Sequence, residues 1–182
     1  MPKGRHFELF SFSCRHCRAG SCGRLRRRLS LLKKTEWVMT YMLPDSELTP
    51  EAFNRRSEGA LPGHIGLVVT HTGRDRFEGH FDIQRHHHAP NGFLHAGSLV
   101  TLADTLCGYA TVANLREGAT GFTTIELKTN FFATALEGRV NAVATPVHVG
   151  GTTQVWDCEL TNAAGKRMAL FRCSQLVLRA KG

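Results

Sequence analysis

The segment from His95 to Leu115 limits the possible folds more than any other part of this 182-residue chain. Its apolar residues occur on nearly every side of a helical wheel, and they include Leu99, Val100, Leu102, Ala103, Leu106, Cys107, Ala110 and Ala113. A helix that is apolar nearly all round is buried on several sides. The segment therefore predicts one long central helix that other elements cover.

Strand-like segments dominate the rest of the chain. A short helix is predicted over 50–57, because Thr49 can cap it and Pro50 suits its first position. Alternating or β-branched patterns predict strands over 64–73, 74–83, 123–133, 139–149, 152–162 and 166–179. Glycine-containing turns separate most of these strands. The order indicates an α+β protein in which an antiparallel sheet is wrapped around the central helix.

The basic charge of the chain is confined to its start. The net charge is +8, but residues 1–34 hold ten Lys or Arg against one acid, and the remainder holds 13 basic and 14 acidic residues. A nearly neutral body argues against a nucleic-acid-binding fold. No apolar stretch approaches the length of a membrane span, so we expect no membrane partner.

Residues 1–38 form an extension, and residues 39–182 form the expected folded domain. The extension contains Cys14, His16, Cys17 and Cys22, but this spacing is a weak zinc signal, and we expect no metal. Disorder is the simplest interpretation of the extension. Single cysteines at apolar positions of the body (Cys107, Cys158 and Cys173) indicate a reducing compartment, so we expect a cytoplasmic protein. The Arg-rich, acid-poor composition also fits a mitochondrial transit peptide, which would place the domain in the mitochondrial matrix.

Asp104 is the one charge within the central helix. A buried carboxylate is costly unless it is paired or its pKa is raised, and such groups gather at functional sites. The alternative is a structural Asp bonded to a neighbouring Thr or to the backbone. We favour a functional carboxylate.

The start of the helix offers a second chemical group. Amides of the first turn, at Ala96, Gly97 and Ser98, lack intrahelical partners and lie at the positive end of the helix dipole. They could stabilise an oxyanion, while Gly92 and Gly97 would let the backbone approach a ligand. The alternative is that Ser98 or water caps them.

Gly97 and Asp104 are too far apart to act on one carbonyl within a single helix. Seven residues at ~1.5 Å each separate them by roughly 10 Å along the axis. A second copy, antiparallel across a two-fold axis, would bring one chain's Asp104 towards the other's Gly97. A stripe of small or polar residues permits that approach: Gly97, Thr101, Asp104, Gly108 and Thr111. We therefore predict a homodimer with two shared sites.

These residues resemble those of a known family. The combination of Gly92-x-x-His95-Ala96-Gly97, Leu102-Ala103-Asp104 and the strand TTIELKTNFF resembles the hotdog-fold acyl-CoA thioesterases, in the phenylacetate-pathway-like and 4-hydroxybenzoyl-CoA-like branch. The resemblance covers about residues 60–180. It implies hydrolysis of an acyl-CoA or aryl-CoA thioester to a free acid and CoA. No cofactor is implied beyond the CoA of the substrate, and pairing of dimers into homotetramers is expected.

The resemblance also implies roles for individual residues. Asp104 matches the acid that acts as nucleophile or general base, and the amides of Ala96 and Gly97 match the donors that polarise the thioester carbonyl. The remaining matches are His95 as a loop-orienting residue, Thr124 as a hydroxyl that positions water, and Gly150, Gly151 and Thr152 as backbone beside the CoA phosphates. From their places in the stripe and the loop, Thr101 and Gly92 are also expected to contact the substrate.

The chain departs from the family pattern at two places. Ala96 replaces the usual middle glycine of His-Gly-Gly, a change that keeps the backbone donor. The usual loop asparagine would fall at Ala89, whereas this chain has Asn91 directly before Gly92. Asn91 either reaches the carbonyl or leaving sulfur, or only makes the turn.

Other interpretations stay open at this point. The histidines of RHHHAP (85–90) suggest a metal, but consecutive loop residues rarely converge on one ion. Gly79-His80-Phe81 resembles the histidine segment of hotdog β-hydroxyacyl-thioester dehydratases. A non-catalytic acyl-CoA-binding protein is a third alternative, although an acyl tunnel has no use for a buried acid. We favour the thioesterase.

Overall fold

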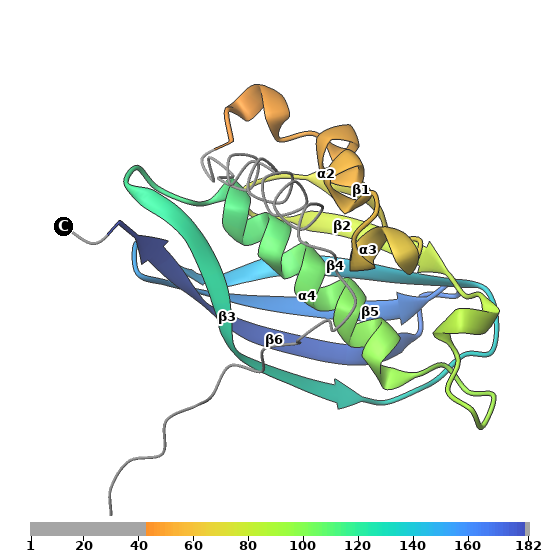
Figure 1. Cartoon of the computed structure of the whole chain (residues 1–182). Coiled ribbons are helices and arrows are strands. Elements are labelled where there is room, and N and C mark those ends of the chain that lie inside the picture. Colours follow the sequence, from red (N-terminus) through yellow and green to blue (C-terminus); the bar gives the residue numbers. More distant parts are fainter. Residues whose placement is uncertain (1–42, 181–182) are drawn as a thin grey trace, which may run out of the picture. The chain divides into compact units, whose positions relative to one another are not determined.

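The computed structural model describes residues 43–180, so the predictions for residues 1–38 lie outside the described residues. Six strands form one antiparallel sheet in the order β1-β2-β4-β5-β6-β3 (Figure 1). The strands are β1 (Val68–Thr72), β2 (Phe77–Asp82), β3 (Ala119–Phe131), β4 (Arg139–Val149), β5 (Thr153–Asn162) and β6 (Arg167–Arg179). The long helix α4 (Ala96–Ala113) lies against one face of this sheet. The predicted α+β architecture around a central helix is confirmed.

Shorter helical segments complete the described part. They are η1 (Asp45–Glu47), α2 (Pro50–Ser57), α3 (Leu61–His64) and η2 (Arg85–His87). Helix α2 begins as predicted, because the Thr49 hydroxyl accepts a hydrogen bond from Ala52 N–H at 3.3 Å. The structure describes no helix long and apolar enough to span a membrane within residues 43–180.

The starts of β1 and β3 differ most from the predicted strand boundaries. The strand expected over 64–73 begins only at Val68, because Pro62 lies in the first turn of the short helix α3. Strand β3 begins at Ala119, before the strand predicted over 123–133, because its first residues pair with Arg179 and Leu178 at the end of β6. A local helix decided the first boundary, and long-range pairing decided the second.

Alternation along β2 brings the sheet close to the helix. Phe77, Gly79 and Phe81 are buried on one face of β2, while His80 lies on the other face. A Cβ at Gly79 would lie 2.7 Å from the Val68 carbonyl oxygen and 3.1 Å from a terminal methyl carbon of Leu106. Only glycine therefore allows this approach of α4 to the sheet.

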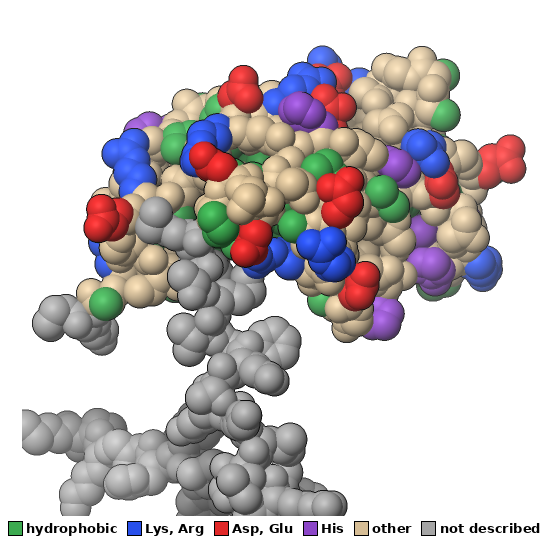
Figure 2. All heavy atoms as spheres, turned by 90° about the horizontal axis from the view of Figure 1, so that it is seen from above, with side chains coloured by type: hydrophobic (Ala, Val, Ile, Leu, Met, Phe, Trp, Pro, Cys, Tyr) green, Lys and Arg blue, Asp and Glu red, His purple; other side chains and the backbone are tan. Residues whose placement is uncertain are grey.

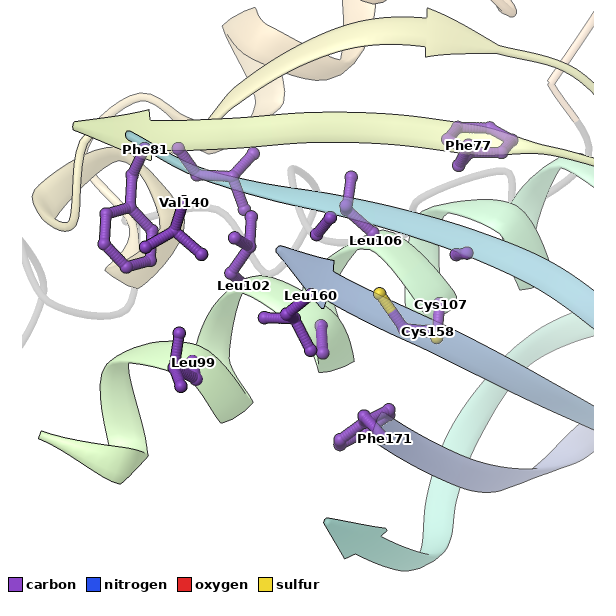
Figure 3. Close-up of a cluster of buried hydrophobic side chains, with 14 of the residues drawn as sticks. Phe77, Phe81, Leu99, Leu102, Leu106, Cys107, Val140, Cys158, Leu160 and Phe171 are labelled. Carbon is purple, nitrogen blue, oxygen red and sulfur yellow. The ribbon is translucent and has the colours of Figure 1, made fainter. Parts of the chain in front are cut away.

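The core fills the space between α4 and the inner face of the sheet. Leucines of α4 point towards Phe81, Leu160 and Phe171 of the strands (Figure 3). Ten of the helix's 18 residues are buried, which confirms that the helix is covered on several sides. At its far end the buried Gln154 amide donates to the Asn114 carbonyl at 3.2 Å and accepts from Trp156 Nε1 at 3.1 Å. These bonds fix the end of α4 to β5.

Strand β3 is an edge of the sheet and carries exposed apolar side chains. It pairs with β6 along its length and stands last in the strand order. Ile125, Leu127 and Phe131 are each about half exposed. A long edge strand with apolar side chains is a template for pairing with another chain.

Surface charge on the described residues is mixed. On the face seen in Figure 2, basic and acidic side chains are interspersed, and histidines gather towards one end. Many of the charges are paired, as in Arg172 with Asp157 and Arg139 with Asp82. The face shown in this view therefore presents no continuous basic patch.

Candidate active site

Asp104 lies half-buried near the middle of α4, on the side that faces β3. Thr124 Oγ1 donates to its carboxylate at 3.4 Å. Burial raises the pKa of Asp104 above its ordinary value of 3.8, and the Thr124 hydrogen bond opposes that rise. The carboxylate is thus partly desolvated, as expected from the sequence, and Thr124 is brought to it from a distant strand.

Alternation along β3 explains why Thr124 faces the helix. The ring of Phe122, two residues earlier, covers Gly108 at 3.2 Å from where its Cβ would lie. Thr124 then follows on the same face, opposite Asp104, because β3 runs antiparallel to α4. A register shift between Thr124 and Glu126 ends this regular alternation.

The helix start is capped by a histidine side chain. His95 is the N-cap of α4, and its Nδ1 accepts a hydrogen bond from Gly97 N–H at 2.8 Å. Ser98 N–H donates to the His95 carbonyl at 3.0 Å, while the Ser98 hydroxyl donates elsewhere, to the His87 carbonyl. The Gly97 amide, which was expected to meet a substrate, therefore donates to the His95 imidazole. The cap is this imidazole and not the Ser98 side chain.

A second histidine anchors the loop before the helix. His87 is buried: its Nδ1 accepts from Gln84 N–H at 2.7 Å and its Nε2 bonds the Ile65 carbonyl at 2.9 Å. Burial is the main cause that lowers its pKa. Its own carbonyl accepts from His95 N–H at 2.9 Å. His87 is therefore a buried structural residue that holds His95 in place.

Within residues 43–180, the structure shows no group of three or more His, Cys, Asp or Glu side chains that could hold a metal ion.

Asn91 and Gly92 form the turn that precedes the helix. Asn91 Oδ1 accepts from Phe93 N–H at 3.2 Å, and Gly92 has a φ of +86°. Both residues are exposed. Of the two roles considered for Asn91, the turn is the one with an observed contact.

Only the first half of the small-residue stripe is accessible. Gly97, Thr101 and Asp104 are partly exposed, and the Thr101 hydroxyl donates back to the Gly97 carbonyl at 2.9 Å. Gly108 is covered by Phe122, and Thr111 is fully buried. The expectation that the whole stripe faces an approaching partner was wrong for these last two residues.

The hairpin predicted to lie beside CoA is at the opposite end of α4 from Gly97. Gly150, Gly151 and Thr152 form the turn between β4 and β5. Gln154, two residues after this turn, donates to the Asn114 carbonyl. Asn114 follows Asp104 by ten residues, which corresponds to about 15 Å along the helix axis. The predicted residues therefore form three groups along α4: those at the loop and helix start, Asp104 with Thr124 near the middle, and this hairpin at the far end.

The dehydratase alternative loses its geometric basis. His80 lies on the outer face of β2, whereas Asp104 lies beneath the inner face. Desolvation is the main cause that lowers the pKa of His80. Within one chain, an acid and a histidine on opposite faces of the sheet cannot act on one substrate.

The antiparallel sheet around one long helix agrees with the hotdog thioesterase fold that the sequence resembles. The family model described as the thioesterase superfamily matches residues 91–169. The proofreading thioesterase EntH of Cronobacter sakazakii is 31% identical over 137 residues, which cover 75% of this chain and 99% of that protein. The 1,4-dihydroxy-2-naphthoyl-CoA hydrolase of Escherichia coli is 30% identical over 140 residues, 75% of this chain and 100% of that protein.

Solved structures agree with this assignment. A thioesterase of Haemophilus influenzae superposes with a TM-score of 0.68 at 27% identity, covering 72% of this chain and 91% of that one. A mutant thioesterase of Pseudomonas aeruginosa gives a TM-score of 0.69 at 26% identity, covering 72% and 95%. The chain belongs to the thioesterase superfamily. The predicted family, fold and enzyme class are confirmed.

Proposed function

We propose that this protein hydrolyses an acyl-CoA or aryl-CoA thioester to a free acid and CoA. The observation that carries the proposal is the half-buried Asp104 carboxylate with its raised pKa, bonded to Thr124 on the accessible side of α4. The similarity to a hydrolase named for a naphthoyl-CoA substrate supports the substrate class.

The proposed chemistry needs only this carboxylate, an amide donor and water. Asp104 either removes a proton from water that attacks the thioester carbonyl, or attacks that carbonyl itself and is released by water. Thr124 would orient the carboxylate and the water. The C–S bond breaks, and the thiolate of CoA leaves and takes up a proton.

Gly97 N–H is the proposed donor to the developing oxyanion. Because this amide donates to His95 Nδ1 in the structure, the imidazole must turn away before the carbonyl oxygen takes its place. The His95 nitrogen occupies the position that the oxyanion would take. The amide is thus already oriented towards an acceptor.

We further infer that each site combines two chains of a homodimer. The axial separation between Gly97 and Asp104 calls for a second copy, and the exposed apolar side chains of edge strand β3 offer a surface for it. Pairing of such dimers into tetramers is a further expectation.

The direct test is an assay of the purified protein with a panel of aliphatic and aromatic CoA thioesters. The release of free thiol measures turnover. Hydrolysis of one or more of them is expected. Failure with every thioester would contradict the proposal and favour a binding protein.

Changing Thr124 to Val is expected to move the pH dependence of turnover. The Thr124 hydrogen bond stabilises the ionised carboxylate, so its loss raises the pKa of Asp104 further. Because the ionised form reacts, the acid limb of the pH–rate profile should move to higher pH, and turnover near that limb should fall by up to about tenfold. Thr124→Ser keeps the hydroxyl and should keep the wild-type profile; an unshifted limb in the Val variant would remove Thr124 from the mechanism.

A further inference from the structure

A fully buried glutamine of β6 lies next to the threonine that bonds Asp104. Gln175 and Thr124 are direct partners in the antiparallel pairing of β6 with β3. Direct partners point to the same face of a sheet, with their Cβ atoms about 5 Å apart. The Gln175 side chain therefore lies beside the Thr124 hydroxyl, on the face of the sheet that α4 covers.

The amide oxygen of Gln175 has no hydrogen-bond partner among the described residues. The residue has an exposed fraction of 0%, and its Nε2 donates to Cys173 Sγ at 3.3 Å. An unpaired buried acceptor is costly, so native cores contain few of them and each calls for an explanation. The unpaired atom of Gln175 is Oε1, which can only accept a proton.

The neighbouring glutamine of β5 shows what a structural role requires. Gln154 is the partner of Gln175 across the sheet and is equally buried. Its nitrogen donates to the Asn114 carbonyl, and its oxygen accepts from Trp156 Nε1. Both ends of Gln154 are thus used by the fold, whereas Gln175 keeps a free acceptor next to Thr124.

The Thr124 hydroxyl has one proton to donate and can also accept one. In the structure it donates to Asp104 at 3.4 Å, which is long for an O–H···O bond and holds the hydroxyl only weakly. An ionised Asp104 can only accept. Once Asp104 has taken a proton from water, it becomes a donor to the Thr124 oxygen, and the Thr124 proton then needs another acceptor.

We propose that Gln175 is a positioning residue whose Oε1 accepts the Thr124 proton when Asp104 is protonated. Hydrogen bonds then run from Asp104 to Thr124 and from Thr124 to Gln175, and they stabilise the protonated acid. The hydroxyl only rotates, so no covalent bond of Thr124 or Gln175 forms or breaks. The inference rests on the proposed function and specifies the branch in which Asp104 removes a proton from water.

The proton balance of this branch is simple. Water gives a proton to Asp104 while its oxygen forms a bond to the thioester carbonyl carbon. The C–S bond then breaks, and the proton passes from Asp104 to the thiolate of CoA. Asp104 is ionised again, and Thr124 turns back to donate to it.

The elements around this chain of hydrogen bonds bring no other charge to its face of the sheet. Burial and the Thr124 hydrogen bond are the causes that shift the pKa of Asp104. The titratable groups beside Gln175 are the buried thiols Cys107, Cys158 and Cys173. Burial raises the pKa of Cys107 well above its ordinary value, so this thiol stays uncharged. Charged residues of β3, β5 and β6 lie on the outer face: Glu126, Lys128, Asp157, Glu159, Arg167 and Arg172.

The test measures the pKa of Asp104 directly, by carbon-13 NMR titration of the carboxyl groups, with Asp104→Asn identifying the signal. Gln175→Met keeps the length of the side chain and removes the acceptor. The protonated acid loses its stabilisation, so the pKa of Asp104 should fall by about half a pH unit. Thr124→Val should raise this pKa, because the ionised form loses its donor. In the double variant Gln175→Met should have no further effect, since Gln175 acts through Thr124.

Gln154→Met is the matched control, because it removes an equally buried amide from the neighbouring strand. It should lower the urea midpoint and leave the pKa of Asp104 unchanged. Gln175→Leu is a second apolar replacement, should Gln175→Met fail to fold. His95 of the second copy in the proposed dimer is common to all these proteins, so its titration does not distinguish them.

An unchanged pKa of Asp104 in the Gln175 variants would overturn the inference, as would an equal shift with and without Thr124. The predicted pattern in a protein that cleaves no thioester would refute the proposed hydrolysis and leave the hydrogen-bond chain standing.

Discussion

Asp104→Asn is expected to lower turnover of a CoA thioester by about 10³-fold, with the wild-type fold retained. Asn has the same shape and can still accept the Thr124 hydrogen bond, but it neither takes a proton from water nor attacks the carbonyl. The measurement is kcat on the best substrate of the panel. Near-normal turnover in a folded dimer would contradict the mechanism.

The same variant should be more stable at neutral pH. Burial raises the pKa of Asp104 in the folded chain, so between the unfolded and folded pKa values the folded state binds more protons. The contribution of Asp104 to the free energy of unfolding therefore falls as pH rises through that window, and above it the ionised, partly buried carboxylate destabilises the folded state. Asn carries no charge and removes this destabilisation, so urea unfolding at pH 7 should show a higher midpoint. Loss of activity with gain of stability would separate a chemical defect from a folding defect.

Gly97→Pro is expected to lower kcat by about 10² to 10³-fold, because it removes one oxyanion donor. Proline is tolerated in the first turn of a helix, where N–H groups lack intrahelical partners. The His95 imidazole loses its partner at the same time. Steady-state kinetics should place the loss mainly in kcat, since the donor acts most strongly on the transition state.

Gly97→Ala is the matched control, because it keeps the N–H. Its Cβ would lie 2.8 Å from His95 Nδ1, so the imidazole must shift, which a side chain can do. Activity should stay much nearer to the wild type than with proline. Equal losses in the two variants would mean that bulk at position 97 matters and the amide does not.

The sequence was sufficient for the architecture because the signals were long and periodic. The apolar pattern around Leu102 and Leu106 could only suit a covered helix, and the alternation of β2 and β5 marked strands with one buried face. The predicted boundary near Val68 failed because the short helix α3 occupies the preceding residues, and the one near Ala119 failed because pairing with distant residues of β6 sets it.

The site was predictable in its parts but not in its contacts. Asp104 stood out as a charge in an apolar helix, whereas the cap by His95 and the buried role of His87 depend on side-chain directions that spacing does not encode. Histidine is also not among the usual N-cap residues.

The most direct test of shared sites is a mixed dimer of one Asp104→Asn chain and one Gly97→Pro chain, purified through two different tags. If one chain's Asp104 works with the other's Gly97, one of the two sites contains both native groups, and turnover should return to about half of the wild-type value per dimer. If each site lies within one chain, every site carries a defect. Turnover no higher than that of the two parent variants would then contradict the shared site.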